Sequence, residues 1–292
     1  MKKPRTVDKG FPDVFGAFLP FFIVAVIGYA IGMVFIKDYP EQCGAYRDND
    51  KSFTPEFAKA MMEEEIENKR TSVWTLGHVL KNRDFWFITV PCGVLLMCSV
   101  GMMTQTSAIL GTYAEEIAVL GGYSGVMVIA YVVACFGSWL MGVLDTKFGT
   151  RKAITFSVVL MIISGIIGII RGAVPLLIAF FLLCIFEGAA SNFTVSAAAQ
   201  YWRREDFPNV FSCVNPIANI FQAVGPMMVA ATVFSPSGYQ LTFGITGGLA
   251  VISLILILLF SPKHVKAVDN NYRKAVGKPM DAVLYSKATG DP

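Results

Sequence analysis

The run from Phe207 to Pro262 reads FPNVFSCVNPIANIFQAVGPMMVAATVFSPSGYQLTFGITGGLAVISLILILLFSP and contains no Asp, Glu, Lys or Arg. Two earlier runs, 85–114 and 117–144, are equally free of these residues. About 20 apolar residues cross a bilayer as a helix, so each run is long enough to span a membrane. The longest run is long enough to cross twice. The sequence therefore predicts a membrane protein.

The composition of the whole chain leads to the same class. Of its 292 residues, 54% are hydrophobic and 15% are charged, whereas soluble proteins carry about 25% charged residues. This excludes a soluble enzyme, a nucleic-acid-binding protein, a secreted disulfide scaffold and a disordered chain. Five of the six cysteines lie in apolar runs, and the chain has only two histidines. Neither a disulfide framework nor a metal site is expected.

Reading along the chain predicts an all-α membrane protein with about seven spans. The turn Ser235-Pro236-Ser237-Gly238 divides the longest uncharged run in two. A tight turn at Arg171-Gly172 separates two further spans. The predicted spans are 15–36, 86–110, 121–144, 153–171, 174–198, 209–234 and 239–261.

Basic residues predict the orientation of these spans, because cytoplasmic loops carry an excess of Lys and Arg. Every Lys or Arg between the spans, except Arg171, falls on the side that holds 37–84 and the tail 263–292. We therefore expect both segments in the cytoplasm of a multi-pass protein of the cell membrane. The N-terminus then lies outside although it is basic, which suggests that the architecture begins upstream of residue 1.

The segment 37–84 is the one sizeable soluble piece. Thr54 and Pro55 predict a helix start, and the helix is expected to run to Arg70. Beyond it, Val73, Leu76 and Leu80, with Trp74, form an apolar stripe that suits the membrane face. The alternative is a solvated linker between two halves.

A hairpin follows the third predicted span. It reads GVLDTKFGTRK, with Gly142, Asp145, Gly149, Arg151 and Lys152 at its marked positions. Asp145 is expected to accept hydrogen bonds from a neighbouring helix N-terminus or to pair with Arg151. The run resembles the G-x-L-x-D-x-x-G-x-R-K signature of the major facilitator superfamily.

Two other stretches resemble the oxalate/formate antiporter and monocarboxylate transporter-like branch of that superfamily. The segment 38–50 is similar to the start of its central loop, and Tyr201 to Phe207 is similar to the loop between its tenth and eleventh helices. The resemblance implies that the chain covers helices six to twelve. It assigns 1–14 as an N-terminal segment, 15–36 as the sixth helix, 37–84 as the central cytoplasmic loop, 85–262 as the C-terminal six-helix half and 263–292 as the tail.

The resemblance also implies alternating-access transport of a small solute, by symport or antiport, and no enzyme activity. In this fold the route runs between two six-helix halves, so the chain is expected to be an N-terminally truncated transporter. Its partners are then the solute, the lipid bilayer and a missing or separately encoded N-terminal half, with no nucleic acid. No cofactor is implied beyond a coupling proton or a counter-transported anion.

Polar residues inside the spans mark the expected route, because polar groups are costly in hydrocarbon and face other helices or water. Those in the fifth and sixth spans recur at helical spacing on one stripe. The candidate pathway residues are Glu187, Ser191 and Thr194, then Asn215, Asn219 and Gln222, and then Tyr131, Ser138 and Gln105.

Glu187 is the only carboxylate deep in a predicted span. Burial disfavours the ionised form of a carboxyl group, so Glu187 is expected to load and release a proton during transport. The structural alternative is a neutral Glu187 that bonds to Asn or Ser on the next helix and ties the bundle together.

The solute stays open at the level of its chemical class. The second-half spans hold no buried cation, which argues against a dicarboxylate site. A monocarboxylate, a neutral solute, or an anion held by a cation elsewhere are left as alternatives. A seven-helix receptor or sensor without transport activity is the other function class, although its spans offer no lysine for retinal.

Small residues predict where helices approach closely. Gly28 and Gly32, and again Gly244 and Gly248, form G-x-x-x-G pairs that permit tight packing between membrane helices.

Overall fold

The computed structural model describes residues 14–37, 39–45 and 54–278. These described residues form helices and no strands, which confirms the predicted all-α class. The chain divides into two compact units, Met1–Asn68 and Lys69–Pro292. The segment 38–50, which carries the central-loop resemblance, lies partly outside the described residues, and 1–13 and 279–292 lie wholly outside them.

The first unit holds α1 (Val14–Phe35), the short 3-10 helix η1 (Pro40–Cys43) and most of α2 (Pro55–Arg70). The apolar window of α1 has a mean hydropathy of 2.4 and buries none of its residues within the unit, which suits a helix surrounded by lipid. α2 starts where the sequence predicts, because the Phe57 N–H donates to Thr54 Oγ1 at 3.3 Å.

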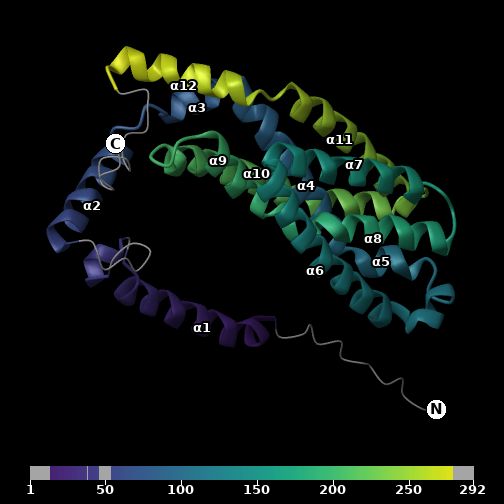
Figure 1. The fold of residues 1–292 in the computed structure, drawn as a ribbon. Helices are drawn as coiled ribbons and strands as arrows, with labels where there is room; N and C mark the ends of the chain where they lie inside the picture. Colours follow the sequence, from purple (N-terminus) through teal and green to yellow (C-terminus); the bar gives the residue numbers. More distant parts are fainter. Residues whose placement is uncertain (1–13, 38, 46–53, 279–292) are drawn as a thin grey trace, which may run out of the picture. The chain divides into compact units, whose positions relative to one another are not determined.

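The second unit is a bundle of the remaining helices, with α4 in its interior (Figure 1). Its described elements are α3 (Leu76–Lys81), α4 (Arg83–Thr104), α5 (Thr106–Gly111), the 3-10 helix η3 (Glu116–Leu120), α6 (Gly122–Phe148), α7 (Thr150–Gly168), α8 (Ala173–Ala190), α9 (Asn192–Tyr201), α10 (Phe207–Val233), α11 (Tyr239–Leu259) and α12 (Pro262–Val276).

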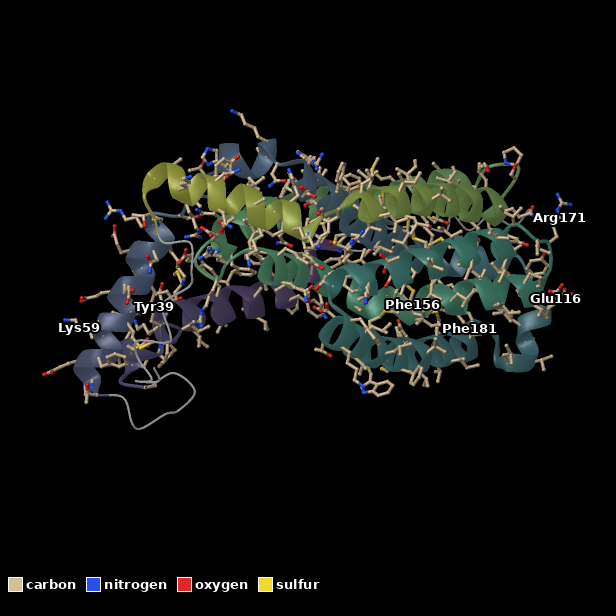
Figure 2. All side chains as sticks on the ribbon, turned by 45° about the horizontal axis from the view of Figure 1, so that its top comes forward. Tyr39, Lys59, Glu116, Phe156, Arg171 and Phe181 are labelled. Carbon is tan, nitrogen blue, oxygen red and sulfur yellow. The ribbon has the colours of Figure 1, made fainter. Side chains whose placement is uncertain are left out.

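Seven of the described helices are long and apolar enough to cross a membrane: α1, α4, α6, α7, α8, α10 and α11. This confirms the predicted number of spans. Figure 2 shows that Glu116 and Arg171 lie together at one end of the second unit, and α12 lies toward the other end. The span directions therefore agree with the predicted alternation of loops.

The predicted span 86–110 is wrong in its length, because the helix breaks at Gln105. That residue has φ −107° and ψ 14°, outside the helical region. The hydroxyls of Thr104 and Thr106 donate to carbonyls of the preceding turn at 2.9 Å. Such back-bonding by Thr bends or ends a helix, so the polar residues that marked this stretch as functional also interrupt it.

The predicted span 174–198 is interrupted at one residue, Ser191, which keeps helical dihedral angles (φ −67°, ψ −30°). α8 ends at Ala190 and α9 begins at Asn192. The Thr194 hydroxyl donates to the Ser191 carbonyl at 3.0 Å, so side-chain bonding again accompanies the interruption. The interruption lies four residues, about one helical turn, after the predicted proton-carrying residue, Glu187.

Close glycine contacts join the spans in pairs. A Cβ added to Gly101, Gly225, Gly165 or Gly137 would lie 2.0–2.6 Å from atoms of the facing helix, so only Gly permits the observed approach at these four positions. The pairs are Gly101 and Gly225 between α4 and α10, Gly165 and Gly247 between α7 and α11, and Gly137 and Ile185 between α6 and α8.

The glycine pair predicted to pack the last span is wrong. A Cβ on Gly248 would meet nothing within 4 Å, and one on Gly244 would meet only the Ile169 side chain at 3.8 Å. Gly247, which lies between them, makes the tight contact. The i, i+4 spacing therefore predicted correctly that this helix packs closely through a glycine, but it predicted the wrong face of the helix.

The apolar stripe predicted before α4 is also wrong as a single surface. Val73 and Trp74 are buried in the second unit, with Trp74 at 0% exposure. Leu76 and Leu80 are 64% and 38% exposed on the outer side of α3. The stripe divides because the chain is extended before α3 and becomes helical only at Leu76.

The segment after the last span begins with an ordered helix. The Ser261 side chain accepts from the His264 N–H, and Pro262 opens α12, which is a favourable helix start. Val265, Asp269 and Arg273 recur every four residues and are all buried. α12 therefore packs on the bundle through one face.

Candidate functional site

The hairpin of the sequence motif joins α6 to α7, and we call the end of the bundle that holds it the hairpin end. Gly149 makes the turn with φ +87°, a backbone conformation that residues other than Gly rarely adopt. Asp145 accepts a hydrogen bond from the hydroxyl of Thr150, the first residue of α7, at 2.6 Å. Asp145 thus fastens the end of α6 to the start of α7.

Arg151 serves a different partner from the predicted one. Its Nε and Nη2 donate to the carbonyls of Ile257 and Leu258 at 3.1 and 2.8 Å. These carbonyls belong to the last turn of α11, where the helix leaves its acceptors unpaired. Among the described residues Arg151 makes no ion pair with Asp145, so of the two predicted alternatives the contact with the start of the neighbouring helix is the one formed.

The first N–H groups of α7 are also satisfied from another helix. The Thr150 N–H donates to Gln200 Oε1 at 2.7 Å, and the Arg151 N–H donates to the Tyr201 hydroxyl at 2.8 Å. Both acceptors lie at the end of α9. The Lys152 ammonium lies 5.5 Å from the centre of the Phe148 ring. The hairpin therefore ties α6, α7, α9 and α11 together at one end.

A groove of about 350 Å³ runs beside this hairpin, between α6 and the broken helix α8–α9. It brings together residues that the sequence placed in separate groups, the hairpin and the transport route. Its lining residues are Ser138, Met141, Gly142, Asp145, Thr146, Ala189, Asn192, Phe193, Val195 and Ser196. Asn192 and Ser196 are the polar members that the predicted stripe missed.

Glu187 lies next to this contact between α6 and α8. A Cβ on the neighbouring Gly188 would approach Ser138 Oγ to 2.0 Å, so the two helices touch here. The Glu187 side chain is half-buried, and its carboxyl makes no hydrogen bond or ion pair within the described part of the chain. The alternative tie to Asn or Ser on the next helix is therefore not present in this arrangement.

The other predicted pathway residues differ in their exposure. Ser191 and Asn219 are exposed, and Tyr131 is 60% exposed. Gln105, Asn215, Gln222 and Ser138 are half-buried, whereas Thr194 is buried. The Thr194 hydroxyl donates to the Ser191 carbonyl and so does not share the exposure of Ser191.

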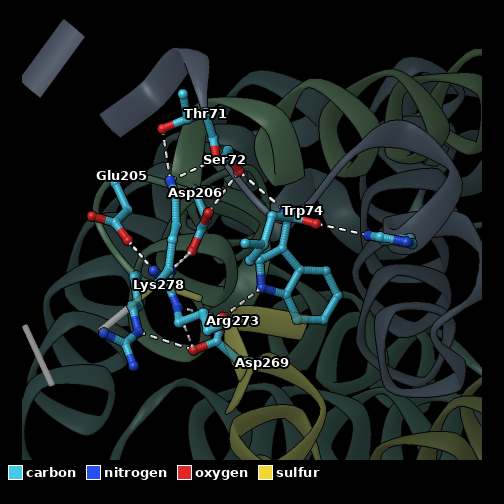
Figure 3. Close-up of polar contacts among 11 residues, drawn as sticks. Thr71, Ser72, Trp74, Glu205, Asp206, Asp269, Arg273 and Lys278 are labelled. Atoms are coloured by element: carbon cyan, nitrogen blue, oxygen red, sulfur yellow. Dashed lines mark hydrogen bonds and ion pairs between the residues drawn. The ribbon is translucent and has the colours of Figure 1, made fainter. Parts of the chain in front are cut away.

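A cluster of charged residues at the hairpin end was missed by the sequence reasoning (Figure 3). It links the segment before α3, the loop before α10 and helix α12. Its core is the Arg273 guanidinium, which contacts Glu205 and Asp206 at 2.5 Å and Asp269 at 3.0 Å. Arg203 reaches Asp269 at 2.9 Å.

Polar and aromatic groups complete this cluster. The Ser72 hydroxyl donates to Asp206 at 2.6 Å, and the Trp74 indole N–H donates to Asp269 at 2.9 Å. The Tyr272 ring stacks on His78 with centroids 4.1 Å apart. Burial raises the pKa of the Asp206 carboxyl, while the Ser72 hydroxyl and the Arg273 guanidinium oppose that rise.

A second contact joins α12 to the bundle. Asp84, fully buried in the first turn of α4, accepts from the Ser261 N–H at 2.9 Å and contacts His264. A signal for α12 was present in the sequence, since Ser261-Pro262 starts a helix and the apolar residues Val265 and Val268 follow at helical spacing.

One comparison with known proteins gave a match. The profile described as Major Facilitator Superfamily matches residues 96–289, about two thirds of the chain. That family consists of multi-pass membrane transporters of small solutes, which are not enzymes. The match gives no assignment to a branch. Neither the search of curated proteins nor the search of solved structures gave a match.

Proposed function

Since the chain belongs to the major facilitator superfamily, we propose that it transports a small organic anion, such as a monocarboxylate, by alternating access. Symport with a proton is the coupling that its residues support best. The proposed route runs between this six-helix half and a second half. The proposed membrane is the cell membrane, with 37–84 and the C-terminus in the cytoplasm.

The observation that carries this proposal is the environment of Glu187. Its carboxyl is half-exposed on a candidate span, and no partner holds it among the described residues. Uncompensated ionisable groups inside membrane spans are rare and usually functional. A structural tie would instead be expected to show a bonded carboxyl.

Charge balance then favours coupled entry of a proton and a monocarboxylate. An ionised Glu187 repels an approaching carboxylate. A protonated Glu187 is neutral and offers an O–H donor to the same carboxylate. The proton and the anion therefore bind best together, and neither has to cross the low-dielectric region as an uncompensated charge.

The surrounding polar groups supply the remaining hydrogen bonds. Ser191 is exposed next to the helix break, and Asn192 and Ser196 line the groove beside α6. Such neutral groups accept or donate without a fixed charge. They suit a solute that carries one negative charge, and they provide no cation to balance the second charge of a dicarboxylate.

The test is uptake of radiolabelled lactate into membrane vesicles from cells that produce the protein, with a neutral sugar for comparison. An inward proton gradient is expected to drive lactate accumulation, and Glu187→Gln is expected to reduce the proton-driven component at least about tenfold, as loss of an essential proton carrier does. Glu116→Gln is the matched control, because Glu116 lies at the far end of the bundle (Figure 2).

Two results would contradict the proposal. Proton-driven uptake that survives Glu187→Gln would remove Glu187 from the coupling mechanism. Uptake of a dicarboxylate at the rate of lactate would contradict the inferred single-charge solute.

A further inference from the structure

Asp206 occupies the N-cap position of α10 without capping that helix. Its side chain makes no bond to the first N–H groups of α10, although Asp is a preferred N-cap residue. Three helices of the same region are capped in the usual way, by the side chains of Thr75, Asn82 and Ser261. The Asp206 carboxylate is therefore committed to other partners.

Those partners come from two distant segments. Asp206 Oδ1 accepts from the Ser72 hydroxyl at 2.6 Å, and Oδ2 accepts from Arg273 Nη2 at 2.5 Å. Arg273 is only 2% exposed, although it lies on a helix beyond the last candidate span. Figure 3 shows the side chains of Ser72, Asp206 and Arg273 converging at one point.

The guanidinium of Arg273 contacts three carboxylates through its three nitrogen atoms. Nη1 contacts Glu205, Nη2 contacts Asp206, and Nε donates to Asp269 on its own helix. The planar guanidinium offers this fork of donors, whereas a Lys ammonium is a single point of charge. Asp269 is held in turn by Arg203 and Trp74. The contact with Asp269 thus holds the Arg273 guanidinium in the orientation in which it contacts Glu205 and Asp206.

α10 connects this anchored end to the residues of the proposed route. Asn215, Asn219 and Gln222 lie on α10, and Asn219 is exposed. At about 1.5 Å per residue, Asn219 lies about 20 Å along the helix from Asp206. A shift or rotation at the hairpin end of α10 therefore changes how these amide side chains are presented.

We propose that Arg273 is a positioning residue for transport, which acts through Asp206 to hold the hairpin end of α10 and thereby its amide stripe. This inference rests on the proposed function, because that function gives the amide side chains of α10 their role in transport. The anchoring itself does not depend on the identity of the solute. Loss of the pair is expected to let α10 sample other positions while the rest of the bundle stays folded.

The experiment separates positioning from folding by comparing single and double variants. A cysteine at Asn219 reports on the α10 face, in a background where the exposed Cys43 and Cys135 are replaced by Ser. Membrane vesicles carrying the full chain are treated with a water-soluble maleimide, and the labelling rate is measured. The thermal midpoint of each purified variant is measured in parallel.

Arg273→Gln is expected to lower the thermal midpoint and to raise the labelling rate at least threefold. Arg273→Gln combined with Asp206→Asn removes the orphaned carboxylate, so the midpoint is expected to recover while labelling stays fast. Arg273→Lys is expected to be intermediate, because it keeps the charge and loses the fork. Lys274→Gln, on the exposed side of α12, is the control and is expected to match the parent.

The proposal is overturned if labelling returns to the parent rate together with stability in the double variant, since the pair would then be structural only. It is also overturned if Arg273→Gln labels at the parent rate. Lactate uptake is measured separately without the Asn219 cysteine, and its maximal rate is expected to change more than its KM. Absence of uptake in the parent with altered labelling in Arg273→Gln would refute the proposed function and leave the anchoring intact.

Discussion

At the scale of single residues, Gly225 sets the separation of α4 and α10. A Cβ at this position would lie 2.2 Å from the Met97 carbonyl oxygen. That atom belongs to the backbone of a helix and cannot turn away. The packing of the helix that carries the amide stripe therefore depends on the absence of one methyl group.

We predict that Gly225→Ala destabilises the bundle by about 1–3 kcal/mol, the usual effect of overpacking in a tight interior. Gly248→Ala is the matched control, because a Cβ there would meet nothing within 4 Å. It is expected to be neutral or slightly stabilising, as Ala favours helix over Gly. Thermal unfolding of the purified variants measures both, and equal midpoints for the two would contradict the packing described.

Residue identity alone predicted some of these roles and not others. The run GVLDTKFGTRK predicted a turn at Gly149 and an anchoring role for Asp145, because local chain geometry requires both. It did not predict that Arg151 would bond the α11 carbonyls, since that partner lies 107 positions away in sequence. For the same reason, the spacing of Gly244 and Gly248 could not reveal that Gly247 faces α7.

At the scale of elements, α12 is the helix whose importance depends most on tertiary contacts. Its buried face carries Val265, Asp269 and Arg273, while its outer face is basic and exposed. Composition therefore makes it look like a solvated tail, and only the partners of its inner face show that it is part of the bundle. Uninterrupted apolar spans need no such information, which is why their number was predictable.

We predict that Val265→Asp detaches α12, because an unpaired charge would be placed at a position that is 1% exposed, at a cost of about 3–5 kcal/mol. Limited proteolysis in the membrane is the measurement, with faster cleavage within 262–276 expected. Val276→Asp on the same helix is 67% exposed and is expected to leave the cleavage rate unchanged. Equal protection of both variants would mean that α12 is not held through this face.

Element boundaries inside the spans were less predictable than the spans themselves. Hydropathy is continuous across Gln105 and Ser191, so a window of apolar residues gives no sign of a break. The breaks arise where Thr hydroxyls bond to carbonyls of the preceding turn. The residues that suggested a polar route are thus also the ones that shorten the helices.

At the scale of the whole molecule, the described bundle has an apolar interior closed by glycine contacts and a set of polar groups outside that interior. Ser191 and Asn219 are exposed on or beside candidate membrane spans. Exposed amide and hydroxyl groups on a membrane span require water or another protein surface. The proposed transport therefore requires these side chains to face a water-filled route and not lipid.

Family and fold class followed from the sequence because a signature hairpin and repeated apolar runs are local properties. The solute did not, because the groups proposed to bind it are mostly neutral, and neutral groups leave many small molecules possible. The charged cluster around Arg273 also escaped prediction, since it joins residues 72, 206 and 273 of three separate segments.

The most direct test is the water accessibility of a cysteine at Ser191, compared with one at Val251, which is also exposed but lies on the apolar surface of α11. Both are introduced without Cys43 and Cys135 and treated in intact lipid membranes with a charged, water-soluble maleimide. A water-filled route beside Ser191 predicts rapid labelling of Ser191→Cys and no labelling of Val251→Cys. Protection of both positions, or labelling of Val251→Cys alone, would contradict it.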